Sequence, residues 1–230
     1  MPAPLRLTSQ TWSTTVENRR QPELQVAASF LLGRGILVMT AKKNAVREVA
    51  ALHQKALLMS ASEIDRTLVR LAHEILEKNG GLTRLGLVGI RRRGVPLAER
   101  LGKIIQKVEK RPVPVGKLDI TFYRDDLSTL GPKPVVQPGQ VGFPIEGKNI
   151  VLIDDVLYTG RTIRAALDAL FSHGRPSIVQ LLVLIDRGHR ELPIEATFVG
   201  RTVQTTNNEV IEVKMIEIDG TEKVLLMERT

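Results

Sequence analysis

The stretch IVLIDDVLYTGRT, residues 150–162, decides the fold that we expect for this chain. Its four leading apolar residues predict a buried strand, and the carboxylates of Asp154 and Asp155 follow at the carboxyl end of that strand. A small-residue turn with Gly160 then leads to a helix N-terminus at Arg161–Thr162, where backbone N–H groups and the helix dipole favour a phosphate. A solvated strand end and a plain turn are the alternative, but the complete string favours a site for a phosphorylated sugar.

Strands and helices alternate on both sides of this stretch. An S-x-x-E capping box at Ser60 begins a helix that Gly80-Gly81 ends, and Pro96 lies in the first turn of a second helix that runs to about Glu109. The alternation predicts an α/β fold, a mostly parallel sheet flanked by helices, with a C-terminal antiparallel hairpin turning at Asp219-Gly220. We expect strands over 85–90, 113–122, 149–153 and 178–185, a third helix over about 162–173, and hairpin strands over 210–218 and 223–227.

The first 59 residues differ from the rest in composition. They carry 8 Lys and Arg against 3 Asp and Glu, which is +5 of the formal net charge of +8. They lack a basic start followed by an unbroken apolar run, so a signal peptide is not indicated. We expect 1–59 to be a poorly ordered extension, or upstream sequence read from an early start codon, with a functional basic arm as the alternative. The folded domain is expected over 60–230, so that a chain starting at Met59 would fold and be active.

Composition excludes several classes of protein. The 230 residues contain no cysteine, which rules out a disulfide framework, a thiolate metal site and a cysteine nucleophile. Aromatic residues are 3 %, so the core must be aliphatic, and no apolar run reaches the length of about 18 residues that a membrane helix needs. No Walker loop or GxGxxG fingerprint is present. After residue 59 the charge is nearly balanced, so any nucleic-acid surface must come from local clustering.

The motif at 150–162 resembles the phosphoribosyl-pyrophosphate (PRPP) motif of type I phosphoribosyltransferases. Two further strings, DITFYRDDL (119–127) and DRGHRELPI (186–194), resemble one branch of them, the PyrR family of bifunctional pyrimidine operon attenuation proteins with uracil phosphoribosyltransferase activity. The resemblance covers about residues 60–230, and the first 59 residues have no counterpart in it. It implies the type I phosphoribosyltransferase fold, a cytoplasmic protein and a homo-oligomer, as a dimer or higher.

The resemblance also implies roles for individual residues. Asp154 and Asp155 would bind the ribose hydroxyls, with Asp155 a candidate for easing deprotonation of uracil N1. Arg124 and Lys133, in the long loop over 123–148, would bring positive charge to the leaving pyrophosphate, with Arg124 counted among the catalytic residues; a disordered crossing is the alternative. Mg²⁺ would be held mainly through the pyrophosphate, with no direct protein ligand. The 5′-phosphate would be cradled by Val156, Leu157, Tyr158, Thr159, Gly160, Arg161 and Thr162.

Two other segments receive roles in substrate binding. GIRRRG (89–94) resembles the pyrophosphate loop, with Arg92 and Arg93 as contacts, although three arginines could also form a solvated turn. Arg187 and Ile211 would lie at the hood that recognises the base, and Arg187 could instead make a structural ion pair. The substrates implied are PRPP and uracil, with UMP and UTP as the uridine nucleotides that occupy the same site.

Binding to pyrimidine operon leader mRNA, promoted by UMP or UTP, is the second function that the resemblance implies. Glu195 stands where the family carries a basic residue, and VQTTNN (203–208) replaces a proline-containing turn, so catalysis is better supported than attenuation. A nucleotide-sensing attenuator with vestigial catalysis, and a phosphoribosyltransferase for another base, are the alternatives. The candidate RNA contacts are Arg66, Arg70, His73, Lys78, His189, Arg190 and Arg201, of which the first three share a helical face that could equally be only the polar side of an amphipathic helix.

Overall fold

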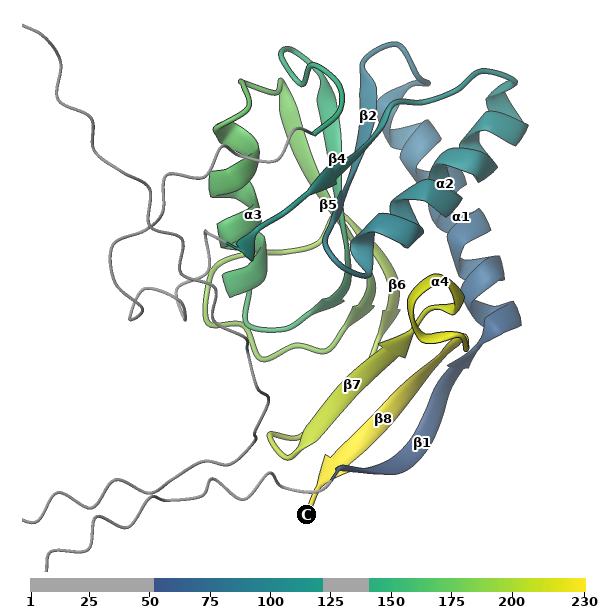
Figure 1. Cartoon of the computed structure of the whole chain (residues 1–230), viewed down its shortest axis with the longest axis vertical. Coiled ribbons are helices and arrows are strands. Elements are labelled where there is room, and N and C mark those ends of the chain that lie inside the picture. The colour runs from purple at the N-terminus through teal and green to yellow at the C-terminus, as the bar shows by residue number, and fades with distance from the viewer. Residues whose placement is uncertain (1–51, 122–140) are drawn as a thin grey trace, which may run out of the picture. The chain divides into compact units, whose positions relative to one another are not determined.

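Five parallel strands form the central sheet of the computed structural model (Figure 1). Their spatial order is β3-β2-β4-β5-β6, and every neighbouring pair is parallel. Because β3 lies on one side of β2 and β4 on the other, the connections that leave β2 and β4 diverge and open a crevice between them. The strands are β2 (Leu85–Ile90), β3 (Val115–Leu118), β4 (Asn149–Leu157), β5 (Ile178–Asp186) and β6 (Phe198–Thr202).

The structure describes residues 52–121 and 141–230, all within one compact unit, Glu48–Thr230. Arg124 and Lys133 therefore lie outside the described residues, as do residues 1–51 of the expected extension. Among the helices of the described part of the chain, none is both long enough and apolar enough to span a membrane.

Two aliphatic cores lie on opposite faces of the sheet. Helices α1 (Ala61–Asn79) and α2 (Gly94–Glu109) cover one face and α3 (Arg161–Phe171) covers the other (Figure 1). The predicted signals at the ends of α1 are confirmed: the Ser60 N–H donates to Glu63 Oε2 at 2.8 Å, and Gly80 ends the helix with a φ of +61°.

A second, antiparallel sheet has the order β1-β8-β7, with β1 (Leu52–Ser60), β7 (Glu209–Lys214) and β8 (Lys223–Arg229). The predicted C-terminal hairpin is confirmed, but its first strand ends at Lys214, and the short helix α4 (Ile216–Asp219) connects it to β8. Helix α4 replaces the expected two-residue turn because Asp219 closes it on Met215: the Asp219 N–H donates to Met215 O at 2.7 Å, and the Met215 N–H donates to Asp219 Oδ2 at 2.9 Å.

Strand β1 corrects the boundary that we expected at residue 60. Residues from Leu52 onward pair with β8, and Lys55 Nζ lies 2.6 Å from Glu209 Oε1 on β7, across the width of the sheet. The strand escaped prediction because it lies at a sheet edge with mostly exposed side chains, so its apolar residues show no inward-outward alternation. A chain starting at Met59 would leave one edge of β8 unpaired, whereas the expectation for residues 1–51 stands as a prediction.

The strands of the central sheet also differ from those expected. Strand β4 continues four residues past Ile153, since it pairs with β5 through Leu157 and Asp186. Strand β3 covers only Val115–Leu118, and β6 was not predicted, because its five residues pair with β5 alone at the edge of the sheet. The extension of β4 matters for function because it places the two aspartates inside the sheet.

Candidate active site

A cavity of about 450 Å³ opens where the chain diverges after β2 and β4. Open α/β sheets bind their ligands at this kind of switch point. The cavity unites residues from the ends of three strands with the first turn of α3. Its lining consists of Arg91, Arg92, Arg93, Asp119, Ile120, Thr121, Asp154, Asp155, Val156 and Thr162.

Hydrogen bonds from the next N–H along β4 orient the side chains of Asp154 and Asp155. Asp154 Oδ1 accepts a hydrogen bond from the Asp155 N–H, and Asp155 Oδ1 accepts one from the Val156 N–H, each at 3.0 Å. Burial, together with the neighbouring charge of Asp155, raises the pKa of Asp154 well above its usual range. Burial also raises the pKa of Asp155, whereas its hydrogen bond with Asp154 and the positive charge of Arg93 act to lower that pKa. Burial therefore works against ionisation of this pair of carboxyl groups.

Asp119 is a third carboxylate in the cavity, and sequence reasoning missed it together with Arg91 and Thr121. It accepts hydrogen bonds from Thr121 Oγ1 at 2.6 Å and from the Thr121 N–H at 3.0 Å, and these bonds lower its pKa. Arg91 Nη1 lies 3.5 Å from Asp119 Oδ2. The only available signal was that these residues directly follow strands whose carboxyl ends meet at one edge. Asp119 therefore stays ionised beside a pair with raised pKa values.

The phosphate turn, Tyr158–Gly160, leads into α3 as predicted. Gly160 has a φ of +93°, and a Cβ there would lie 3.3 Å from the side chains of Leu192 and Ile194, so only glycine fits without strain. Thr162 lines the cavity, and the first-turn amides of α3 point out of the helix end without intrahelical acceptors. The Leu157 side chain is buried in the core, so this residue contributes only its backbone to the turn.

Close backbone contacts explain the glycines of GIRRRG. A Cβ on Gly89 would lie 2.4 Å from Gly94 O, and a Cβ on Gly94 would lie 2.2 Å from Ile153 O on β4. The loop between β2 and α2 is therefore pressed against the strand that carries the aspartate pair. The Arg91–Arg92 peptide bond within this loop is cis.

Arg187 and Ile211 lie outside the lining of this cavity. Arg187 is buried, with 6 % of its surface exposed, and donates to Thr205 Oγ1 at 3.1 Å and to the carbonyl oxygen of Glu209 at 2.8 Å. Its guanidinium also stacks 4.2 Å from the centroid of the Tyr158 ring. Ile211, on β7, packs in the core. Arg187 thus anchors the antiparallel sheet to the phosphate turn, and its partners are backbone oxygens, a hydroxyl and a ring rather than the expected alternative of an ion pair.

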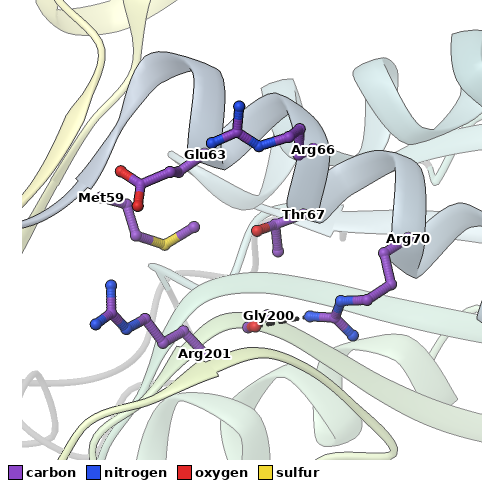
Figure 2. A pocket seen from close by; sticks show the side chains of 7 residues that line it. All are labelled: Met59, Glu63, Arg66, Thr67, Arg70, Gly200 and Arg201. Atoms are coloured by element: carbon purple, nitrogen blue, oxygen red, sulfur yellow. Dashed lines mark hydrogen bonds between the residues drawn. The ribbon is translucent and has the colours of Figure 1, made fainter.

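A separate cavity of about 320 Å³ collects three of the arginines that we considered as RNA contacts (Figure 2). Arg66 and Arg70 come from α1 and Arg201 from β6. Arg70 Nη2 donates to Gly200 O at 2.7 Å, and Arg201 donates to the carbonyl oxygen of Leu58, so both are held by backbone acceptors. Arg66 is exposed and has no hydrogen-bond partner among residues 52–121 and 141–230, which leaves it available to an external anion.

The remaining RNA candidates do not join that cavity. Lys78, near the C-terminal end of α1, borders a different hollow with Thr197 and Phe198, and His73 is exposed on α1. His189 and Arg190 lie beside the phosphate turn: His189 packs edge-on against the Tyr158 ring, and Arg190 donates to Tyr158 O at 2.9 Å.

The loop that carries His189 and Arg190 makes further hydrogen bonds with the phosphate turn and the start of α3. The N–H groups of Glu191 and Leu192 both donate to Thr159 O, at 3.0 and 3.2 Å, and Arg161 Nε donates to Glu191 Oε2 at 2.6 Å. Glu195 is exposed at the far end of this loop. Of the candidate RNA contacts, Arg66, Arg70 and Arg201 therefore share one cavity, and His189 and Arg190 lie against the phosphate turn, whereas His73 and Lys78 belong to neither group.

Comparison with known proteins gives the family of the chain. Residues 60–217 match the phosphoribosyl transferase domain family. The chain is 58 % identical to "Bifunctional protein PyrR" of Pelotomaculum thermopropionicum over 175 residues, which is 76 % of this chain and 97 % of that protein. It is 57 % identical to the protein of the same name from Thermus aquaticus, with the same shares covered.

Solved structures share the fold at lower identity. A hypoxanthine phosphoribosyltransferase from Trypanosoma cruzi matches with a TM-score of 0.59 and 20 % identity, over 76 % of this chain and 96 % of that one. The corresponding enzyme from Staphylococcus aureus matches with a TM-score of 0.55 and 21 % identity, over 75 % and 92 %. Fold, site and relatives agree: the chain belongs to the PyrR family of type I phosphoribosyltransferases, which unites uracil phosphoribosyltransferase activity with regulation.

Proposed function

We propose that the cavity at the switch point transfers the phosphoribosyl group of PRPP to N1 of uracil, forming UMP and pyrophosphate. The observation that carries this assignment is that one cavity joins the Asp154–Asp155 carboxyl pair, the first turn of α3 through Thr162, and a loop of three arginines. These groups match the ribose hydroxyls, the 5′-phosphate and the pyrophosphate of PRPP, in that order.

The reaction forms the bond from uracil N1 to ribose C1 and breaks the bond from C1 to the pyrophosphate oxygen. The electron pair of the breaking bond leaves with pyrophosphate, while N1 loses its proton. Arg92 and Arg93 stabilise the negative charge that develops on the leaving oxygens. Asp155 is our candidate for receiving the N1 proton, since burial raises its pKa and makes it a stronger base than an ordinary carboxylate. Arg124 and Lys133 are assigned to pyrophosphate by sequence alone.

Magnesium fits this site as a companion of the substrate. Among residues 52–121 and 141–230, no three acidic or histidine side chains converge as a metal cage. The ionised Asp119 and the Asp154–Asp155 pair nevertheless leave oxygen acceptors that the waters of a hydrated cation could reach. When bound through the pyrophosphate oxygens, Mg²⁺ supplies positive charge to the leaving group.

One assay tests the proposed activity. The purified protein is incubated with PRPP, Mg²⁺ and, separately, uracil, cytosine, adenine or hypoxanthine, and the mononucleotide formed is measured. We expect UMP from uracil and no product from the other bases. The control is Asp154→Asn with Asp155→Asn, which preserves the size of both side chains and should abolish turnover. Equal turnover by the variant, or a preference for another base, would contradict the assignment.

A second function, binding of pyrimidine leader mRNA under the control of UMP or UTP, is favoured by the hydrogen bonds between the phosphate turn and the loop of His189 and Arg190. A 5′-phosphate that orders Tyr158–Gly160 would also order this loop, because Thr159 O and Tyr158 O accept bonds from it. Occupancy of the active site and the shape of the proposed RNA surface would then be linked. We further propose that the protein acts in the cytoplasm, where PRPP and nascent mRNA occur, and that it assembles as a homo-oligomer.

Arg66 offers a cleaner test of RNA binding than Arg70 or Arg190, because those two residues hold backbone carbonyl oxygens in place. We expect Arg66→Ala to weaken binding of leader RNA and to reduce the dependence of affinity on salt concentration by about one unit of log–log slope. Lys103→Ala, which removes a charge from α2, serves as the control. Unchanged RNA affinity of Arg66→Ala, measured by gel shift at two salt concentrations with UMP present, would remove this cavity from the RNA surface.

A further inference from the structure

Helix α4 makes two ionic contacts with α2, one of which touches the active site. Arg93, at the start of α2, donates from Nη2 to Asp219 Oδ1 at 2.9 Å, and Arg100, two turns later, holds Glu217 with Nε and Nη2 at 2.7 and 3.0 Å. Arg100 also pairs with Glu222 just beyond α4. The connection between β7 and β8 is thus tied to the helix that follows the arginine loop.

The carboxylate of Asp219 has two different tasks. Its Oδ2 accepts the Met215 N–H and closes α4, while its Oδ1 binds Arg93. The Met215 side chain is fully buried, so this end of the turn cannot shift freely. Both partners lower the pKa of Asp219, the Met215 N–H more than Arg93, which keeps the carboxylate ionised and able to hold a guanidinium.

Arg93 depends on this contact for its orientation. Within the described part of the chain, Asp219 is the only hydrogen-bond partner of the guanidinium, and the buried Nε has none. The same side chain lines the cavity and acts electrostatically on Asp155. An arginine has several rotatable bonds, so without an anchor it would occupy many rotamers and lose the geometry that stabilising a leaving group requires.

We propose that Asp219 is a positioning residue of the transferase, which orients Arg93 toward pyrophosphate through their ionic hydrogen bond. The inference rests on the proposed function of the cavity. It assigns a role to the C-terminal hairpin, since the short helix that connects its strands sets the position of a residue on the pyrophosphate loop.

The test compares two acid-to-amide substitutions on the same short helix. In Asp219→Asn, the amide oxygen can still accept the Met215 N–H, but the NH2 group that then faces Arg93 is a donor and cannot accept its hydrogen bond. Glu217→Gln is the matched control, because it weakens an equivalent contact with Arg100 away from the cavity. We expect Asp219→Asn to raise the KM for PRPP by about tenfold, the equivalent of one charged hydrogen bond, with little change in the KM for uracil. Glu217→Gln should leave both constants unchanged.

Binding of inorganic pyrophosphate with Mg²⁺, followed by calorimetry, gives a readout that does not depend on turnover. Asp219→Asn should weaken this binding by a similar factor, and in an Arg93→Gln background it should have no further effect. If the wild-type chain binds pyrophosphate but forms no UMP, the proposed function fails while this inference is still tested. If Asp219→Asn binds pyrophosphate as tightly as Glu217→Gln, or still weakens it in the Arg93→Gln background, the role of Asp219 is refuted.

Discussion

Substitution of Gly94 by alanine tests whether the active site depends on contact between the arginine loop and β4. Gly94 is the first residue of α2, and its φ lies outside the left-handed region, so alanine suits the backbone conformation. The added Cβ would lie 2.2 Å from Ile153 O and 3.3 Å from the Cα of Asp154. Steric overlap with β4 is therefore the whole perturbation.

The size of the effect follows from that distance. A carbon atom and a carbonyl oxygen normally approach to about 3.3 Å, so the loop or the strand must move by about 1 Å. Overpacking of this kind costs about 1–3 kcal/mol of stability, or roughly 2–12 °C in melting temperature for a domain of this size. A displacement of about 1 Å between reacting groups lowers kcat/KM by about 100-fold, which is about 2.7 kcal/mol of transition-state stabilisation.

Gly102→Ala is the matched control on the same helix. Its Cβ would lie 2.7 Å from Val115 Cγ2, a side-chain atom that can rotate away, and Gly102 is not part of the cavity lining. We expect the control to lose some stability and to keep its kcat/KM for PRPP. Melting curves and steady-state kinetics on both variants separate the two effects. A Gly94→Ala enzyme that is folded and within about threefold of the control in kcat/KM would refute the dependence on close packing.

Three further substitutions test other parts of the structure. In thermal melts, Asp154→Asn with Asp155→Asn should become increasingly more stable than the wild type as pH rises from 4 to 8. Burial raises the pKa values of both aspartates, so the wild type loses stability as these groups give up their protons over that range. A stability difference that does not depend on pH would contradict the raised pKa values. Glu209→Gln should be less stable than the wild type at pH 7 in urea unfolding, and this difference should shrink as pH falls from about 4.5 toward 2. The reason is that hydrogen bonds from Lys55 and from the Thr206 N–H lower the pKa of Glu209 to about 2. A constant difference in stability would mean that β1 is not held by this charge. Glu195→Arg should bind leader RNA more tightly by about 1 kcal/mol, or roughly fivefold, at moderate salt. Its transferase rate should stay unchanged, because the residue is exposed outside the cavity lining. Equal affinities in gel shifts at two salt concentrations would show that residue 195 does not face RNA.

Local chemistry made much of the fold and of the site predictable. Helix α1 could be bounded from its own residues because the capping box and Gly80 act within a few positions of the chain. The phosphate turn was equally readable, since a buried strand, small residues and a helix start must follow one another directly to build it. Asp119 and Arg91 were missed because their role depends on the strand order, which brings the ends of β2, β3 and β4 together.

The parallel core, the position of the carboxylate pair and the family could all be predicted from sequence, because each follows from patterns within a short stretch. The residues that hold the site in shape became visible only in the folded chain. Arg93 and Asp219 are 126 positions apart, and Arg187 reaches Glu209 across 22 positions. Strand β1 has mostly exposed side chains and is specified by its partner β8. Such contacts depend on how separate elements meet in space, and a single sequence does not encode that geometry as a local pattern.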